Sequence, residues 1–118
     1  MSQASDTMRR EWKINDAKRD AGLTTPDDIQ RFDDIQYGPD SVENKLDVYR
    51  PKNTQGKIPV IVSVHGGGWV YGDKERYQFY CMDLAERGFA VHLAQHCLRL
   101  IWLMRKFLYF FYKSLIFY

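Results

Sequence analysis

Cysteine is scarce in this sequence: only Cys81 and Cys97 occur in 118 residues. Two thiols are too few for a disulfide scaffold, and the absence of a C-x-x-C pair excludes the usual spacing of a zinc or redox site. We therefore predict that both cysteines are buried or free thiols. Residues 1–19 lack the apolar core of a signal peptide, so nothing marks the chain for secretion and we expect a cytoplasmic protein.

Phosphate-binding signatures are missing as well. Neither G-x-x-x-x-G-K-[ST] nor G-x-G-x-x-G can be read, although three consecutive glycines stand at 66–68. Anion or nucleotide binding by these glycines is a weak alternative, because no lysine or Mg²⁺-binding hydroxyl follows them directly. Basic residues near the N-terminus alternate with acids, which is typical of a solvated helix face, so we expect no nucleic-acid partner.

The sequence does contain a glycine-rich stretch in an informative position. Residues 65–73 read HGGGWVYGD, preceded by a β-branched run at 60–64 and followed by a segment with helical spacing. Glycines carry no Cβ, so their backbone can take positive φ angles and direct several N–H groups at one point. The order strand, glycine loop, helix predicts a loop that binds negative charge, such as the oxygen of a tetrahedral acyl intermediate.

Four segments around this loop resemble the start of a known family. They are KLDVYRP at 45–51, the strand at 59–64, HGGGW-x-x-G at 65–72 and RGFAV at 87–91. Over about residues 33–91 the chain is similar to the N-terminal part of an α/β-hydrolase of the HGGG esterase and lipase type, which is hormone-sensitive-lipase-like. The resemblance implies an incomplete α/β-hydrolase sheet, and a carboxylic-ester hydrolase that acts on small acyl esters without a cofactor.

The resemblance also implies roles for single residues. The backbone N–H groups of Gly67 and Gly68 would form part of an oxyanion hole, and Gly66 would permit the turn. His65 looks like a loop-positioning residue rather than the catalytic base. Trp69 could pack beside the acyl site, with plain core packing as an equal alternative.

The remaining catalytic parts cannot be found. No G-x-S-x-G occurs, and in this family the acid and the base follow that serine. Ser63 lies inside a strand and is interpreted as a buried hydroxyl. His92 and His96 are four residues apart and could bind a metal from one helix face, but no H-E-x-x-H accompanies them and no metal site is predicted. Nucleophile, acid and base are therefore absent, and we expect the chain alone to be inactive.

Hydrophobic spacing outlines the elements before the loop. Residues 1–22 predict a peripheral helix that ends before Gly22. Thr25 and Pro26 predict the start of a short second helix. Alternation at 33–38 and 45–50 predicts two antiparallel edge strands, and the apolar run at 60–64 predicts the central strand.

After the loop we expect a helix and a parallel strand that together complete a βαβ unit. Asp73 would cap the helix, and Arg87 with Gly88 would end it. Its predicted apolar face comprises Tyr77, Tyr80, Cys81, Leu84 and Ala85. The next strand would begin at Phe89, and a sheet cut after it would leave an uncovered apolar edge.

The last 30 residues differ in character from the rest. Residues 89–118 hold four of the 17 basic residues, none of the 15 acidic ones, half of the 18 aromatic ones, and no Gly, Pro or Asn. Their basic residues leave uncharged pieces shorter than the ~18 to 20 residues that span a bilayer, although contact with a membrane interface is compatible with this composition. We interpret the tail after about Val91 as the result of a truncation or an altered reading frame.

These patterns divide the chain into an N-terminal helical segment at 1–30, the N-terminal part of an α/β-hydrolase domain at 31–91 and a divergent hydrophobic basic tail at 92–118. The favoured function is that of a serine-esterase or lipase-like portion that carries the oxyanion loop. The alternative is a non-enzymatic scaffold whose basic aromatic tail binds a partner or a membrane surface.

Overall fold

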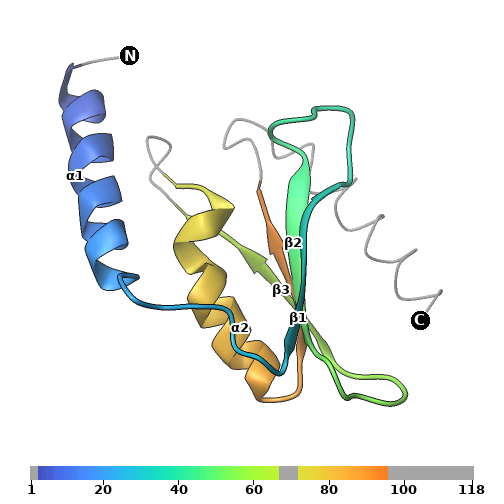
Figure 1. Cartoon of the computed structure of the whole chain (residues 1–118). Helices are drawn as coiled ribbons and strands as arrows, with labels where there is room; N and C mark the ends of the chain where they lie inside the picture. Colours follow the sequence, from blue (N-terminus) through green and yellow to red (C-terminus); the bar gives the residue numbers. More distant parts are fainter. Residues whose placement is uncertain (1–2, 67–71, 96–118) are drawn as a thin grey trace.

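The computed structural model describes residues 3–66 and 72–95, which form a four-stranded sheet with one helix packed on it and another helix standing apart (Figure 1). The elements in chain order are α1 (Gln3–Arg19), β1 (Ile29–Gln36), β2 (Lys45–Pro51), β3 (Val60–Val64), the 3₁₀ helix η1 (Lys74–Tyr77), α2 (Gln78–Glu86) and β4 (Ala90–Ala94). This mixed arrangement confirms the predicted α/β class. The tail at 96–118, with His96 and Cys97, lies outside the described residues.

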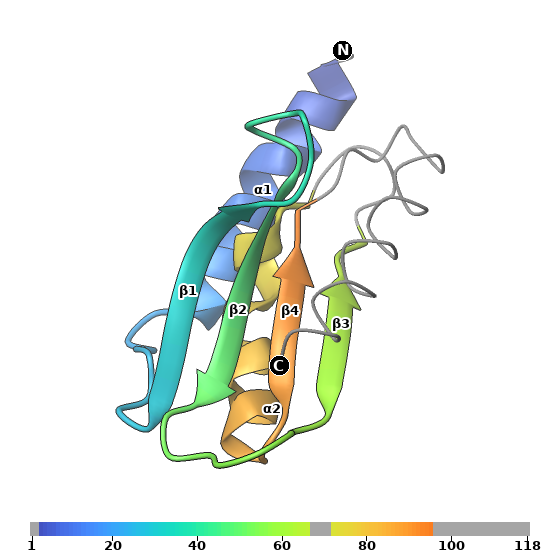
Figure 2. The same cartoon turned by 90° about the vertical axis from the view of Figure 1, so that its right-hand side faces the viewer.

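The strand order of the sheet is β1-β2-β4-β3, as Figure 2 shows. β1 pairs antiparallel with β2, and β3 pairs parallel with β4 across the η1–α2 crossover, so both predicted pairings are confirmed. The prediction that 60–64 is the central strand is wrong, because β4 lies between β2 and β3. An apolar sequence shows that a strand can be buried, but it does not fix the order of strands.

β3 is consequently an edge of the sheet in the part of the chain that the structure describes. Val62 and Val64 are 42% and 47% exposed on it. An uncovered apolar edge of this kind is open to pairing with another strand, as we expected of an incomplete hydrolase sheet. Among residues 3–66 and 72–95, no helix has the length and apolar character needed to cross a membrane.

The core lies between α2 and the face of the sheet that it covers (Figure 2). Its fully buried members are Ile29, Tyr49, Cys81, Met82, Ala85, Val91 and Leu93. Tyr80 was wrongly predicted to belong to this face, since it is 62% exposed, and Met82 was missed. The cause is η1: a 3₁₀ turn advances about 120° per residue rather than about 100°, which shifts the helix face relative to Tyr77.

The predicted helix start at Thr25 and Pro26 is also wrong. The Ile29 N–H donates to the Pro26 carbonyl in a turn, and β1 begins at Ile29. The Lys52 N–H donates to the Asp28 carbonyl and extends the ladder with β2. Pairing between strands therefore outweighs the local capping preference here.

α1 is a peripheral helix, as predicted, and Gly22 beyond its end has a φ of +82°. Its contacts run to Arg76 of η1. The Arg76 guanidinium lies 5.8 Å from the centroid of the Trp12 ring and 3.6 Å from the Asp16 carboxylate. Arg19 Nη2 donates to the Arg76 carbonyl at 2.7 Å. These contacts hold α1 against the segment that follows the glycine loop.

His92 gives the fold a predictable dependence on pH. It lies in β4 between Val48 and Val62, on the face opposite α2, and burial lowers its pKa from 6.5 to about 4. The unfolded chain therefore takes up this proton first as the pH falls. We expect stability to be complete above pH 6.5 and to fall by about 1 to 3 kcal/mol toward pH 4. Urea denaturation of the full chain across this range measures the loss.

The matched variant for this prediction is His92→Gln, which keeps a polar group of similar size but does not titrate. Its unfolding free energy should change less than that of the wild type between pH 6.5 and about 5. If the unfolding free energies of the two proteins fall in parallel as the pH is lowered, groups other than His92 cause the acid sensitivity.

Candidate active site

The glycine loop begins where β3 ends and lies at the carboxyl end of the parallel β3–β4 pair. Ligand sites of α/β proteins form at this edge of the sheet. His65 and Gly66 make the incoming limb of the loop, and Gly72 and Asp73 make the outgoing limb. Gly67, Gly68 and Trp69 fall outside the described residues, so their assigned roles stay predictions. The predicted order of strand, loop and helix is confirmed.

His65 is buried and is only 3% exposed. Its Nδ1 lies 3.2 Å from the Gly66 carbonyl oxygen, so the ring contacts the backbone of its own loop. The role of His65 as a loop-positioning residue, rather than the catalytic base, stays a prediction.

Gly72 brings the two limbs of the loop into contact. Its φ of +130° lies in a region that favours glycine. A Cβ at this position would collide with the Gly66 carbonyl oxygen and approach His65 Nδ1 to 2.9 Å. The close approach of the limbs therefore requires glycine.

We expect Gly72→Ala to destabilise the chain by about 2 to 4 kcal/mol, because backbone strain and the collision with Gly66 add together. Gly56→Ala is the matched control: it has a φ of +79°, but nothing lies within 4 Å of the added Cβ. That control should cost about 1 kcal/mol. Chemical denaturation measures both, and equal losses would show that the limbs do not constrain one another.

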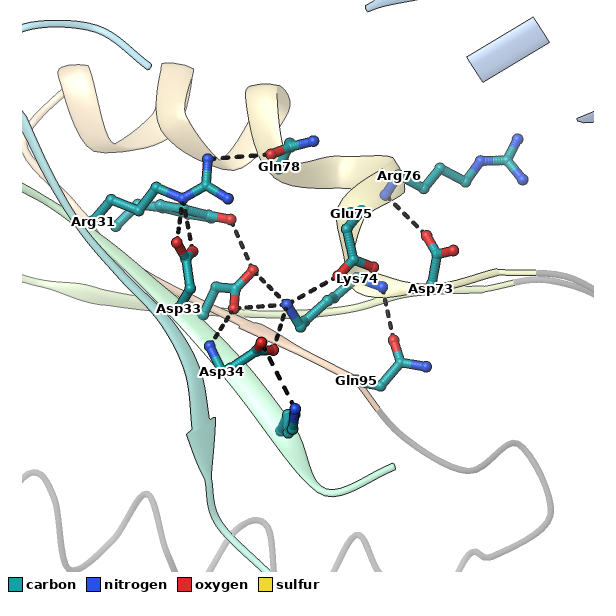
Figure 3. Close-up of polar contacts among 12 residues, drawn as sticks. Arg31, Asp33, Asp34, Asp73, Lys74, Glu75, Arg76, Gln78 and Gln95 are labelled. Carbon is teal, nitrogen blue, oxygen red and sulfur yellow. Dashed lines mark hydrogen bonds and ion pairs between the residues drawn. The ribbon is translucent and has the colours of Figure 1, made fainter. Parts of the chain in front are cut away.

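A buried ion cluster, which we did not predict, lies directly beyond the loop (Figure 3). Lys74 follows Asp73, and its Nζ lies 2.8 and 2.9 Å from the carboxylate oxygens of Asp47 in β2. The side chains of Lys74 and Asp47 are only 7% and 1% exposed. Asp34 and Glu75 also pair with the ammonium, at 3.1 and 3.0 Å. The cluster joins the outgoing limb to two strands of the sheet.

Asp47 is itself held in place by two further donors. The Tyr49 hydroxyl donates to Asp47 Oδ2 at 3.1 Å, and the Asp34 N–H donates to Oδ1 at 2.9 Å. Asp34 sits at a β-bulge between Phe32 and Ile35, with a φ of +57°. Bulges commonly re-aim a side chain near an active site, and this one brings both the amide and the carboxylate of Asp34 to the cluster.

Pairing within the cluster shifts the pKa values of Lys74 and Asp34 so that both charged forms are favoured. Burial alone would lower the pKa of Lys74, but hydrogen bonds to Asp47, Glu75 and Asp34 outweigh it and raise that pKa. The hydrogen bond and the charge of Lys74 lower the pKa of Asp34. Burial, together with the charge of Asp47, raises the pKa of Tyr49 far above its usual value. Lys74 therefore stays protonated, which suits it to a structural role and not to proton transfer.

The backbone of Lys74 makes a separate contact. Its N–H donates to Gln95 Oε1 at 2.8 Å, and Gln95 directly follows β4 (Figure 3). The Gln95 N–H donates to the Lys45 carbonyl, and the Tyr37 hydroxyl donates to the Gln95 carbonyl at 2.7 Å. Lys74 is thus connected to the ends of three strands.

One sequence signal could have found this cluster. Alternation places Asp47 on the same face of its strand as Tyr49, which is the face that α2 covers. A carboxylate predicted in a core requires a cation or several donors, because burying an unpaired charge is very costly. Nothing local, however, identifies Lys74 rather than Lys45 or Lys52 as the partner.

The other candidates that the structure describes, Ser63 and His92, do not assemble into a catalytic group. Ser63 is half-buried within β3, and its hydrogen bond to the Cys81 thiol only partly offsets the burial that raises the pKa of Cys81. His92 lies on a strand and not on a helix. Across residues 3–66 and 72–95, no three His, Cys, Asp or Glu side chains are placed to hold a metal ion.

Comparison with known proteins gives consistent results. The family model BD-FAE matches residues 46–100. An isoprenylcysteine alpha-carbonyl methylesterase from Arabidopsis thaliana is 46% identical over 57 residues, which are 48% of this chain and 13% of that protein. A kynurenine formamidase from Danio rerio is 34% identical over 62 residues, 52% of this chain and 21% of that protein.

Solved structures of esterases share the fold of this chain. Esterase B from Lactobacillus rhamnosis superimposes with a TM-score of 0.69 and 27% identity, covering 75% of this chain and 29% of the esterase. A brefeldin A esterase, described as a bacterial homologue of human hormone sensitive lipase, superimposes with a TM-score of 0.56 and 25% identity, over 75% of this chain and 26% of the esterase. The matched part of the chain thus spans 13% to 29% of the length of these proteins.

Proposed function

Because the chain belongs to the esterase and lipase group of the α/β-hydrolases, of which it spans one part, we propose that it supplies the oxyanion-hole loop of a carboxylic-ester hydrolase. The observation that carries the proposal is the position of His65 and Gly66 at the carboxyl end of the parallel β3–β4 pair. Polar groups at this edge can converge on one ligand.

In the proposed mechanism, the loop acts when a nucleophile attacks the ester carbonyl and the carbonyl oxygen becomes negatively charged. The N–H groups of Gly67 and Gly68 would donate to that oxygen, Gly66 would permit the turn, and Trp69 would line the acyl side. Each such donor stabilises the transition state by about 2.7 to 4 kcal/mol, since it binds the oxyanion more strongly than the ground-state carbonyl. His65 would support the loop from below.

The proposed substrates are carboxylic esters with a small acyl or alcohol group. The methylesterase relative supports an ester, and its identity over the shared segment exceeds that of the formamidase relative. An oxyanion hole serves formamide hydrolysis by the same chemistry, so an N-formyl substrate belongs in the same assays. The cytoplasmic setting remains a prediction.

We expect the full chain alone to hydrolyse p-nitrophenyl acetate no faster than buffer. The sequence holds no G-x-S-x-G, and an oxyanion hole without a nucleophile only polarises the carbonyl. Release of p-nitrophenolate, followed by absorbance, measures the rate. The control is Ser63→Ala: turnover above background in the wild type that this variant removes would contradict the proposal, because the chain would then carry its own nucleophile.

A further inference from the structure

We propose that Lys74 is a positioning residue of the glycine loop, which it holds by joining the outgoing limb to Asp47 and to the ends of neighbouring strands. The catalytic meaning of this role rests on the proposed function, because the loop geometry matters to ester hydrolysis only if the loop is an oxyanion hole. The argument concerns the described residues on either side of the loop.

The incoming limb is fixed by the sheet itself. His65 follows Val64, the last residue of β3, and is buried. β3 pairs with β4 from Val60 to Val64, so the position of His65 follows from the register of the parallel ladder. No extra anchor is needed on this side of the loop.

The outgoing limb has no strand of its own, and Lys74 provides its connection to the sheet. The Nζ pairs with Asp47 of β2 and with Asp34 of β1, at 2.8 and 3.1 Å. The N–H of the same residue donates to Gln95 after β4. One residue thereby links the outgoing limb to the three strands that do not lead into the loop.

The two limbs also meet one another. Gly72 is two residues before Lys74, and a Cβ on it would collide with the Gly66 carbonyl oxygen. A shift of Lys74 away from Asp47 would therefore change the contact between Gly72 and the residues that begin the loop. Groups that orient a catalytic element in this way preorganise it, because their own positions are locked by burial and hydrogen bonds.

The charges argue for positioning rather than for direct electrostatic stabilisation. Three carboxylates, from Asp34, Asp47 and Glu75, surround the Lys74 ammonium, and Lys45 adds one more cation at 3.7 Å from Asp34. The cluster therefore carries one more negative than positive charge. A surplus of negative charge does not stabilise an oxyanion, so the contribution of Lys74 lies in where it holds the backbone.

Hydrogen exchange of the ¹⁵N-labelled full chain, measured by NMR, tests the proposal in Lys74→Met. We expect the amide of residue 74 to exchange at least about tenfold faster and the Gly66 amide and His65 ring signals to shift. In Lys74→Met the amides of Val91 and Leu93 in β4 accelerate with the loss of global stability, whereas in the double variant with Asp47→Asn they should stay within about twofold of the wild type. The matched control is Glu75→Gln. Glu75 is an exposed partner of the Lys74 ammonium and lies outside the sheet, so the NMR signals of the loop should not shift in this variant.

A second variant covers the case in which Lys74→Met unfolds. Asp47→Asn combined with Lys74→Met leaves no unpaired charge in the core and keeps Oδ1 as an acceptor for the Asp34 N–H, while the new amide NH2 can donate to the Tyr49 hydroxyl oxygen. We expect it to show the same response at the loop. Wild-type exchange at residue 74 in either variant would overturn the proposal. Equal acceleration at loop and core amides in the double variant, or unfolding of both variants, would also overturn the proposal, because the Lys74–Asp47 pair would then serve folding alone.

This experiment uses no substrate, so it is independent of the proposed function. If the loop amides respond as expected but the chain is shown not to be part of an esterase, Lys74 still positions the loop. Only the link between that position and catalysis is then rejected. If the chain is part of an esterase but the loop amides do not respond, the positioning role of Lys74 is rejected and the proposed oxyanion hole is unaffected.

Discussion

Lys74→Met should lower the free energy of unfolding by about 3 to 5 kcal/mol, the range found when one partner of a buried ion pair is removed. The reason is the position of Asp47, whose side chain is 1% exposed and would be left in the core without its cation. This loss is comparable to the entire stability of many domains, so we expect a large part of the variant to be unfolded at equilibrium. Urea denaturation followed by far-UV circular dichroism measures it.

Two controls separate this effect from the general cost of a substitution. Adding Asp47→Asn to Lys74→Met removes the unpaired charge and should restore most of the loss. Arg87→Met breaks the exposed pair between Arg87 and Asp83, whose side chains are 66% and 52% exposed, and should change the free energy of unfolding far less. A loss for Lys74→Met as small as that for Arg87→Met would contradict the buried pairing.

The second large effect is expected in catalysis. Residues 46–95 of this chain could replace the matching segment of esterase B from Lactobacillus rhamnosis, to which it is structurally similar. In such a chimera, which contains a complete catalytic group, Gly68→Pro should lower kcat by about 100 to 1,000-fold because it deletes one oxyanion N–H. Steady-state kinetics on a p-nitrophenyl ester measures the change.

The matched substitution in the chimera is Ser63→Ala. Ser63 is half-buried in β3 and its hydroxyl contacts Cys81, so we expect kcat to stay within about threefold of the parent chimera. A similar loss for Gly68→Pro and Ser63→Ala would show that the kinetics report disturbance of β3 and not the removal of a donor.

Local and periodic features of this fold could be predicted from the sequence. Alternation identified β2 and placed Asp47 and Tyr49 on one face, and the glycine loop followed a β-branched strand as expected. Gly88 ended α2 with a φ of +95°. Each of these features depends on residues close together in the chain, where turn-forming residues and hydrophobic periodicity determine the local structure.

Features that depend on distant residues could not be predicted. The insertion of β4 between β2 and β3 is a choice of topology, which the apolar character of 60–64 does not reveal. The helix start at Thr25 gave way to pairing between β1 and β2. Lys74 and Asp47 are 27 residues apart, and no local pattern joins them. The sequence therefore predicted where the glycine loop lies along the chain, but not the Lys74–Asp47 pair beside it.

A structure of the chimera with a phosphonate ester inhibitor on its serine tests the central claim most directly, because the phosphonate oxygen takes the place of the oxyanion. The account predicts that this oxygen accepts hydrogen bonds from the N–H groups of Gly67 and Gly68 at about 2.7 to 3.1 Å, with Lys74 still paired to Asp47. An oxygen that faces away from both glycines, with donors supplied by other loops, would contradict it.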